Sequence, residues 1–280
     1  MWKGLQRKVN RPMSELPKDI PETLLWHRMD SEPDLQQSLR DLRQTAGAIG
    51  AQAARLLPSY TDHSVKHFDA LWQVSSQILT REEIENISAG EAFVLGSSFY
   101  IHDLGMAFAA TQEGKEILLA SDAYETVVRR LESNTKLHVD QIKEIALQTA
   151  ARELHAAKAR ELVLQPLPGL GRYLIESTGI RDQWATYIAD VSASHHWSLA
   201  EIDDRLGRRG RFPDPSGGEI DLAYVACALR IIDYAHINFE RASNLDRLLR
   251  SDVDPSSVVH WDAQAHITGP HRYGDSLVFG

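Results

Sequence analysis

The chain has 280 residues, a formal net charge of −9 and 43% hydrophobic residues, which is ordinary for a globular protein of one large domain. No run approaches the ~18 apolar residues of a membrane span, and no apolar core follows the charged N-terminus, so a membrane protein and a secretory signal are excluded. The net charge argues against broad coating of nucleic acid, although a local basic groove stays open. Cys227 is the only cysteine, which excludes an internal disulfide and a thiolate metal cluster and favours a cytoplasmic location.

The first half of the chain predicts an N-terminal arm followed by helices. Four prolines within residues 1–33 predict an irregular arm with at most a short helix. From Asp34 to Leu56 apolar residues recur at spacings of three, four or seven, which predicts a helix that Pro58 stops. Further helices are expected at 64–79, 82–87 and 89–102, the last capped by Ser88.

The second half predicts more helices and a different ending. Helices are expected at 121–131, 139–164, 181–194, 198–206 and 220–248. A break rich in Pro and Gly spans 166–171, and a loop at 207–218 carries Arg208, Arg209 and Arg211. Short β-like runs follow at 258–259, 266–267 and 276–279. We therefore expect an all-α fold: an arm (1–33), a helical bundle (34–250) and a small C-terminal β-like extension (251–280), which is an appendage or the start of a truncated next domain.

The candidate chemistry centres on His102 and Asp103, which follow the apolar run 93–101. An imidazole beside a carboxylate offers two ligands for a divalent metal, and the apolar run would bury them. Asp233 lies inside another apolar helix, where burial of a carboxylate is costly unless it is paired or bound to metal. Arg230, three residues away, offers the alternative of an ion pair within the helix.

Further histidines lie on either side of this pair. His63 and His67 are four residues apart and share one face of a helix; the alternative is a capped helix start with two histidines in solvent. His155 lies in a long amphipathic helix, where a lone histidine is usually structural. His195 and His196 follow two small residues at the end of a helix and can project into a cavity.

The order His67, His102-Asp103, Asp233 resembles the HD superfamily of metal-dependent phosphohydrolases, whose signature is His, His-Asp and Asp on a helical fold. The additional histidines resemble the members that carry two metals, such as HD-GYP phosphodiesterases and some dinucleotide-polyphosphate hydrolases. A closer similarity is to the HD domains of bacterial conflict and defence proteins, often joined to an ATPase. It is carried by Tyr60-Thr-Asp-His63, Arg152-Glu-Leu-His155 and the segment 256–261. Trp197 stands where HD-GYP proteins have Gly-Tyr-Pro, so cyclic-dinucleotide specificity is not indicated.

The resemblance implies a site with one or two divalent metals. His67, His102, Asp103 and Asp233 would hold the first metal, with His67 favoured over His63 and with Asp103 bridging. His155, His195 and His196 would hold the second. Mixed imidazole and carboxylate ligands favour Mn, Fe, Ni, Co or Zn, with Mg as a further candidate. His102 and Asp103 would be the catalytic pair.

The resemblance also implies a phosphate-bearing substrate, either a nucleotide or single-stranded nucleic acid. Four residues near the expected ligands are candidates to bind it: His63, Lys66, Lys158 and Arg230. An ATPase domain or subunit is an expected partner, a membrane is not, and an oligomer is compatible with the sequence. The alternative function is a regulatory module that senses a nucleotide or couples to a partner without turnover.

Overall fold

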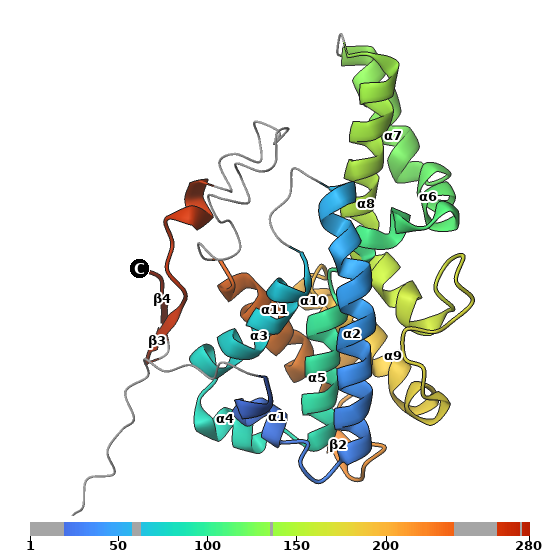
Figure 1. Cartoon of the computed structure of the whole chain (residues 1–280). Helices are drawn as coiled ribbons and strands as arrows, with labels where there is room; N and C mark the ends of the chain where they lie inside the picture. Colours follow the sequence, from blue (N-terminus) through green and yellow to red (C-terminus); the bar gives the residue numbers. More distant parts are fainter. Residues whose placement is uncertain (1–19, 58–62, 135–136, 238–261, 275) are drawn as a thin grey trace, which may run out of the picture.

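The computed structural model describes residues 20–57, 63–134, 137–237, 262–274 and 276–280. In these ranges helices make up the body of the molecule, and strands form only two short antiparallel hairpins (Figure 1). The expected all-α bundle with a small C-terminal β hairpin is therefore confirmed. The domain limits at residues 34 and 251 stay predictions.

The elements follow one another along the chain with short connections. The helices are η1 (Ile20–Glu22), α1 (Leu24–His27), α2 (Pro33–Leu56), α3 (Val65–Ile78), α4 (Arg81–Asn86), α5 (Ala89–Ile101), η2 (Leu104–Ala110), α6 (Gln112–Leu119), α7 (Asp122–Asn134), α8 (Val139–Leu164), α9 (Thr178–Ser194), α10 (Leu199–Ile202), η3 (Asp203–Gly207) and α11 (Leu222–Ala235). The strands are β1 (Phe212–Pro213), β2 (Glu219–Ile220), β3 (His271–Tyr273) and β4 (Ser276–Val278).

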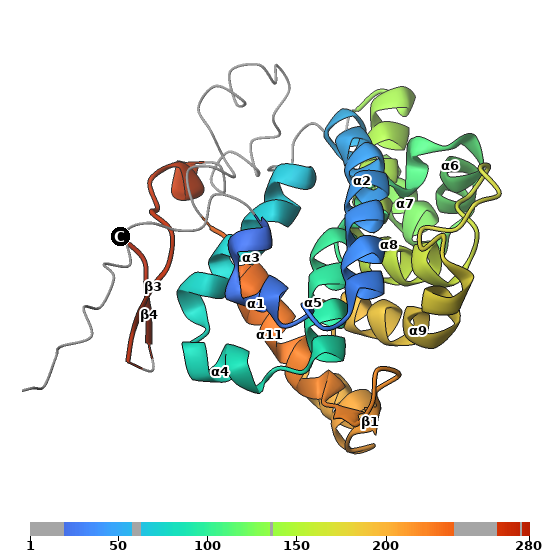
Figure 2. The same ribbon diagram turned by 60° about the horizontal axis from the view of Figure 1, so that its bottom comes forward.

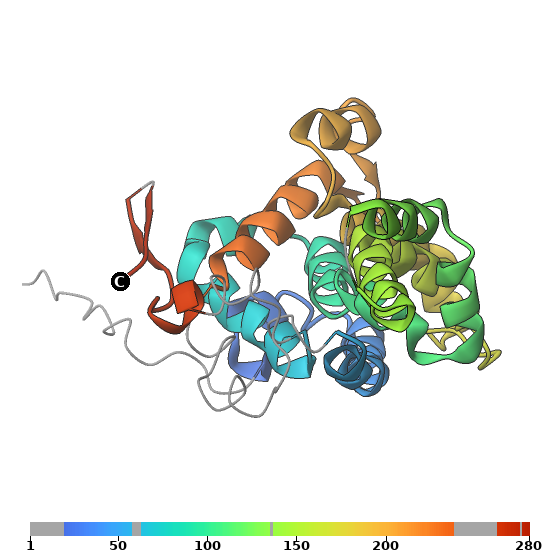
Figure 3. The same cartoon turned by 90° about the horizontal axis from the view of Figure 1, so that it is seen from above.

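Helix α5 is the centre of the bundle. Its residues from Gly90 to Ile101 are all buried, because the apolar run leaves no polar face for solvent. Ser88 and Glu91 form a capping box that fixes where the helix begins. The helix packs against α2, α3, α9 and α11, and the view along the bundle in Figure 3 shows α5 enclosed among them. Its C-terminal end is therefore delivered to the interior of the protein.

The other helices lie on two sides of α5. Helices α6, α7, α8 and α9 gather on one side, whereas α1, α3 and α4 lie on the other (Figures 2 and 3). Part of the expected N-terminal arm also packs into the second of these sides, which contains α3 and α4. Trp26 of α1 is buried and its ring meets that of Trp72 edge-on, with centroids 5.7 Å apart. The short helix expected in the arm thus contributes to the core.

Most of the expected helices are confirmed, but several details differ. Helix α11 ends at Ala235, so the expectation of a helix through residue 248 is wrong at its end; residues 238–248 lie outside the described part. Helix α9 begins at Thr178, three residues before the expected start at residue 181, because Ser177 caps it. The loop at 207–218 contains β1, which pairs with β2, and residues 266–267 form no strand. The element η2 and helix α6 were not expected.

The C-terminal hairpin is tied to the second side of the bundle. Arg272 donates hydrogen bonds to the carbonyl of Ile78 at 2.8 Å and to Glu83 at 2.7 Å. This attaches β3 to the end of α3 and the start of α4. Among the described helices none alone is long and apolar enough to cross a bilayer; only α5 and η2 together, bent by 44°, have that length and composition.

Candidate metal centre

The candidate centre is built around the end of α5. The helix ends at Ile101, and His102 follows it with helical backbone angles. The Nδ1 atom of His102 lies 3.2 Å from the carbonyl oxygens of both Ser98 and Phe99. Because a carbonyl only accepts, Nδ1 carries a proton, and Nε2 faces away from the helix. His102 is thereby prepared as a ligand through Nε2.

A first cluster of four side chains meets at this point: His67 of α3, His102, Asp103 and Asp233 of α11. The Nε2 atoms of His67 and His102 lie 3.4 Å apart. Oδ1 of Asp233 is 3.5 Å from each of these two nitrogens. Oδ2 of Asp103 is 3.5 Å from Nε2 of His67 and 3.2 Å from that of His102. Three segments distant in sequence, α3, the end of α5 and α11, thus converge on one small volume.

A second cluster lies next to the first and consists of His155 of α8 with His195 and His196 at the end of α9. The Nε2 atoms of His155 and His195 are 2.9 Å apart. Their Nδ1 atoms donate to the carbonyls of Arg152 and Ser192, at 2.5 and 2.6 Å. The ring of His196 is exposed and lies 4.4 Å from that of His155, centroid to centroid. This cluster therefore opens toward solvent on the side of His196.

Asp103 lies between the two clusters. Its Oδ2 atom faces His67 and His102, as given above, whereas its Oδ1 atom lies 3.3 Å from Nε2 of His155 and 3.6 Å from Nε2 of His195. The side chain is buried, so water does not screen these contacts. One carboxylate can therefore serve two neighbouring cations at once.

The charges of the metal-free site follow from burial and from the carboxylates. Burial by itself lowers the pKa of His102, but Asp103 and then Asp233 outweigh it and raise that pKa to about 10. Burial raises the pKa of Asp103, yet His102 and His63 hold it well below its usual range. Burial, reinforced by the charge of His102, lowers the pKa of His195 to about 3. The centre thus holds an ion pair between His102 and Asp103 beside a neutral His195.

The spacing of the donor atoms fits a metal ion. Two ligand atoms about 2.1 Å from one ion, at angles between tetrahedral and octahedral, are about 3.0–3.4 Å apart. The ligand-atom distances given above, from 2.9 to 3.6 Å, lie in or close to that range, and all ligand atoms of each cluster lie within 4.8 Å of one another. Imidazole and carboxylate groups are ligands that borderline divalent metals accept. Together the clusters can hold one or two ions, whose identity the donors leave open.

The four residues expected to bind substrate lie in different environments. Nε2 of His63 lies 3.6 Å from Oδ2 of Asp103, at the edge of the first cluster. Lys66 is exposed on α3. Lys158 bonds both carboxylate oxygens of Glu161, at 2.9 and 2.8 Å. Arg230 donates to the carbonyl of Trp197. Asp233, which the sequence offered as its ion-pair partner, turns toward His67 and His102.

The arginines of the loop at 207–218 belong to neither cluster. Arg208 pairs with Asp203 and Asp204, at 3.3 and 2.9 Å, so part of its charge is already balanced. Arg209 and Arg211 are exposed. The segment 256–261, part of the resemblance to conflict-associated HD domains, lies outside the described residues.

Sequence reasoning missed His236. Its Nδ1 atom lies 2.8 Å from Nδ1 of His67, and its side chain is buried. The spacing in the sequence indicated this residue in part, because a residue three positions after Asp233 returns to the same side of a helix. The early end of α11, which turns the ring toward His67, had no such signal.

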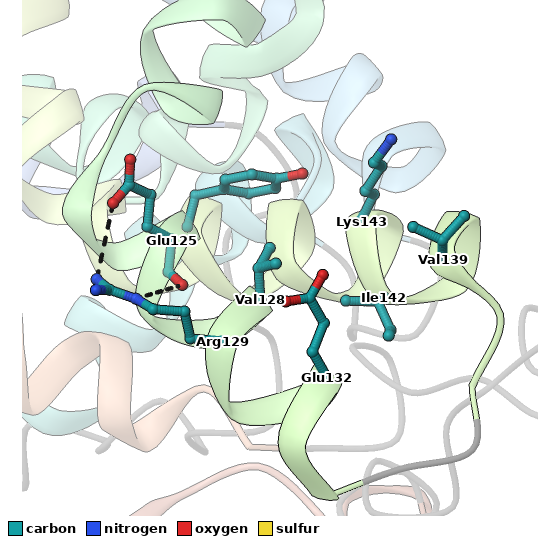
Figure 4. A pocket seen from close by; sticks show the side chains of 8 residues that line it. Glu125, Val128, Arg129, Glu132, Val139, Ile142 and Lys143 are labelled. Atoms are coloured by element: carbon teal, nitrogen blue, oxygen red, sulfur yellow. Dashed lines mark hydrogen bonds and ion pairs between the residues drawn. The ribbon is translucent and has the colours of Figure 1, made fainter.

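A separate cavity of about 330 Å³ lies between α7 and α8. Figure 4 shows apolar Val128 and Ile142 between the helices and the Glu125–Arg129 ion pair at the rim. The residues that line this cavity include no member of either cluster. It is thus distinct from the candidate centre.

Comparison with known families agrees with this geometry. A family model described as HD-CE matches residues 57–277, which is most of the chain. A search among curated proteins found no significant match, and a search among solved structures found none either. The matched range contains both clusters. The chain therefore belongs to the HD-CE family and carries an HD-type domain with the histidine–aspartate clusters of a metal-dependent hydrolase.

Proposed function

We propose that this protein is a metal-dependent phosphohydrolase that cleaves a phosphodiester or phosphoanhydride bond in a nucleotide or nucleic acid. The observation that carries the proposal is the position of Asp103, with one carboxylate oxygen facing each histidine cluster. A single ion needs no such arrangement. A pair of ions next to each other does, because a shared carboxylate fixes their separation.

The proposed ligand roles follow from the two clusters. His67, His102, Asp103 and Asp233 bind one ion, and His155, His195 and His196 bind the other, with Asp103 shared. Bound divalent ions lower the pKa of a water and neutralise phosphate oxygens. The carbonyl bonds to the outer nitrogens of His102, His155 and His195 hold these rings in their ligand orientation.

The proposed contacts to substrate start with His63. Its side chain is 12% exposed, so the ring reaches the edge of the site that a substrate would approach. An imidazole N–H there can donate a hydrogen bond to a substrate oxygen. Lys66 is exposed and can supply positive charge. Lys158 and Arg230 would have to exchange their bonds to Glu161 and Trp197 for a phosphate.

We extend the proposal to the setting of the activity. A single-stranded nucleic acid or a nucleotide is the proposed substrate, an ATPase domain or subunit the proposed partner, and antiviral defence the proposed role. The support is the similarity of three sequence segments to conflict-associated HD domains. The competing function is a regulatory module that binds metal and nucleotide without turnover, and the full set of candidate ligands favours the enzyme.

The test begins with the metal content of the purified protein. We expect one to two transition metal ions per chain, and hydrolysis of at least one compound among dNTPs, cyclic nucleotides, dinucleotide polyphosphates and single-stranded DNA after loading with Mn²⁺. Asp103→Asn should remove most of the metal and lower turnover by at least about 10³-fold, while circular dichroism stays unchanged, because the shared ligand is lost.

The matched control is Asp190→Asn, since Asp190 lies on α9 but pairs with Arg160 away from both clusters. This variant should keep its metal and its turnover. Protein that binds Mn²⁺ and the nucleotides yet hydrolyses none of them would support the regulatory alternative. Protein that binds no transition metal would refute the proposal.

A further inference from the structure

Three of the proposed ligand histidines share one kind of support. The Nδ1 atoms of His102, His155 and His195 each lie within hydrogen-bond distance of a main-chain carbonyl three or four residues earlier. A carbonyl oxygen cannot donate, so each bond fixes the proton on Nδ1 and leaves Nε2 for a metal. The helices themselves therefore determine the tautomer of these three rings.

His67 is held differently. Its Nδ1 atom lies 2.8 Å from Nδ1 of His236, and the two rings are inclined by only 8°. One nitrogen must donate and the other accept, and an imidazole can do either. Since Nε2 of His67 faces His102, Asp103 and Asp233, a ligand role through Nε2 requires that His67 donates its Nδ1–H and His236 accepts.

The end of α11 places Nδ1 of His236 next to Nδ1 of His67. The helix stops at Ala235, and His236 leaves it with φ −81° and ψ 59°, while its N–H bonds the carbonyl of Asp233 at 3.0 Å. Only 2% of His236 is exposed. The same turn of chain places Oδ1 of Asp233 3.5 Å from Nε2 of His67. One helix end thus contacts both nitrogens of the His67 ring.

We propose that His236 is a positioning residue for the first cluster: its Nδ1 accepts the Nδ1–H of His67 and so fixes the tautomer and orientation of that ring toward the metal. The inference rests on the proposed metal-dependent function. It predicts that the acceptor atom of residue 236, rather than its bulk, determines how tightly the first cluster binds an ion.

Two substitutions separate these properties. His236→Phe keeps a ring but has no acceptor, whereas His236→Asn keeps an oxygen close to the position of Nδ1. The metal-free proteins are titrated with Mn²⁺ alone, and electron paramagnetic resonance measures the concentration of the unbound ion at each step. These data give the affinity of each site. We expect His236→Phe to bind one of its Mn²⁺ ions about 10–100-fold more weakly than the wild type, as for other outer partners of metal ligands. His236→Asn should stay within about threefold of the wild type.

The matched control is the same pair of changes at His271, an exposed histidine in the C-terminal hairpin, which should leave Mn²⁺ affinity unchanged. If His236→Phe binds Mn²⁺ as tightly as the wild type, or if His236→Asn is as weak as His236→Phe, the inference is overturned and the metal centre itself stands. If the wild type binds no Mn²⁺, the proposed function fails instead.

A measurement on the unaltered protein covers the case in which His236→Phe does not fold. Long-range ¹⁵N–¹H spectra of the zinc-loaded full chain, assigned through main-chain connectivities, report which ring nitrogen carries each proton. We expect a proton on Nδ1 of His67 and on Nε2 of His236. A proton on Nδ1 of His236, donated toward His67, would overturn the inference.

Discussion

The proton on His102 is the feature with the most direct consequence at the scale of single residues. Asp103 and Asp233 raise the pKa of His102 to about 10 against the effect of burial, so the metal-free protein keeps this imidazole charged at pH 7. An imidazole must be neutral to bind a metal. The ion that binds must therefore displace a proton.

We predict that uptake of the first metal ion at pH 7 releases about one proton, and that affinity rises by about tenfold per pH unit up to about pH 10. Calorimetric titration in buffers with different enthalpies of ionisation measures the number released. The same titration at pH 10.5 is the control, since His102 is then mostly neutral. Equal apparent enthalpies in all buffers at pH 7 would contradict the prediction.

The same shift affects the stability of the metal-free protein. The folded-state pKa of His102 lies above the unfolded value, so its ion pair contributes its full stabilisation below about pH 6.5. That contribution declines as the pH rises and is gone above about pH 10. The depressed pKa of His195 acts in the other direction. Below about pH 6.5 the unfolded chain takes up a proton that the buried imidazole accepts only near pH 3, so stability is lost as the pH falls.

At the scale of the elements, Gly105 controls how closely η2 approaches α8. A Cβ atom at this position would collide with the carbonyl oxygen of His155 and come within 2.9 Å of the main-chain nitrogen of Ala159. The value of this glycine is therefore close packing of two main chains rather than freedom to turn. The contact sets the distance between Asp103, two residues earlier, and His155.

We predict that Gly105→Ala pushes α8 away and weakens the second cluster more than the first. The variant should bind about one metal ion fewer than the wild type and lose about 1–3 kcal/mol of stability, the usual effect of overpacking. Metal analysis and urea denaturation measure these quantities. Gly179→Ala is the control, because a Cβ at this position in α9 meets no atom within 4 Å. Loss of metal from both variants alike would contradict the prediction.

The sequence predicts well those elements whose signals are local. Apolar spacing and caps gave α2, α3, α5 and α8 nearly to their ends, since each carries a long stripe or a clear cap. The element η2 escaped prediction because Leu104–Ala110 is an apolar run without helical spacing. Helix α6 escaped because its eight residues are too few for a clear periodic pattern. The end of α11 has no Gly or Pro to mark it, and it depends on the contact of His236 with His67.

The candidate site also contains residues that the sequence identifies and contacts that it does not. The expected residues of the two clusters could be named from the sequence because family order and flanking residues identify them, and the structure brings them together. The pairing of Lys158 with Glu161 and of Arg230 with Trp197 could not be read from the sequence. These contacts depend on side-chain positions that periodicity does not specify.

At the scale of the whole molecule, the two clusters lie between helices whose other contacts with one another are packing contacts of the core. Their side chains come from α3, α5, α8, α9 and α11 and from both sides of the bundle, as the positions of these helices in Figure 1 make clear. Ions bound there would join these helices directly. The folded state therefore gains stability from any ion that the unfolded chain does not bind.

We predict that Mn²⁺ or Zn²⁺ at 100 times its dissociation constant stabilises the protein by about 2.7 kcal/mol per site, which corresponds to roughly 5–10 °C in Tm. Differential scanning calorimetry with and without metal measures the shift, and added chelator should reverse it. Asp103→Asn serves as the control and should show little shift. An equal shift in that variant would place the ions elsewhere on the protein.

Helix α5 also determines the order in which ligands can arrive. Its main-chain dipole points its negative end at the candidate centre, where Asp103 and Asp233 add formal negative charge. A phosphate that reaches this region before any cation is repelled by all three, a repulsion that the positive charge of His102 offsets only in part. Cations that load first would reverse the sign of the local field, so an anionic substrate of the kind proposed above would enter the metal-loaded site and avoid the empty one.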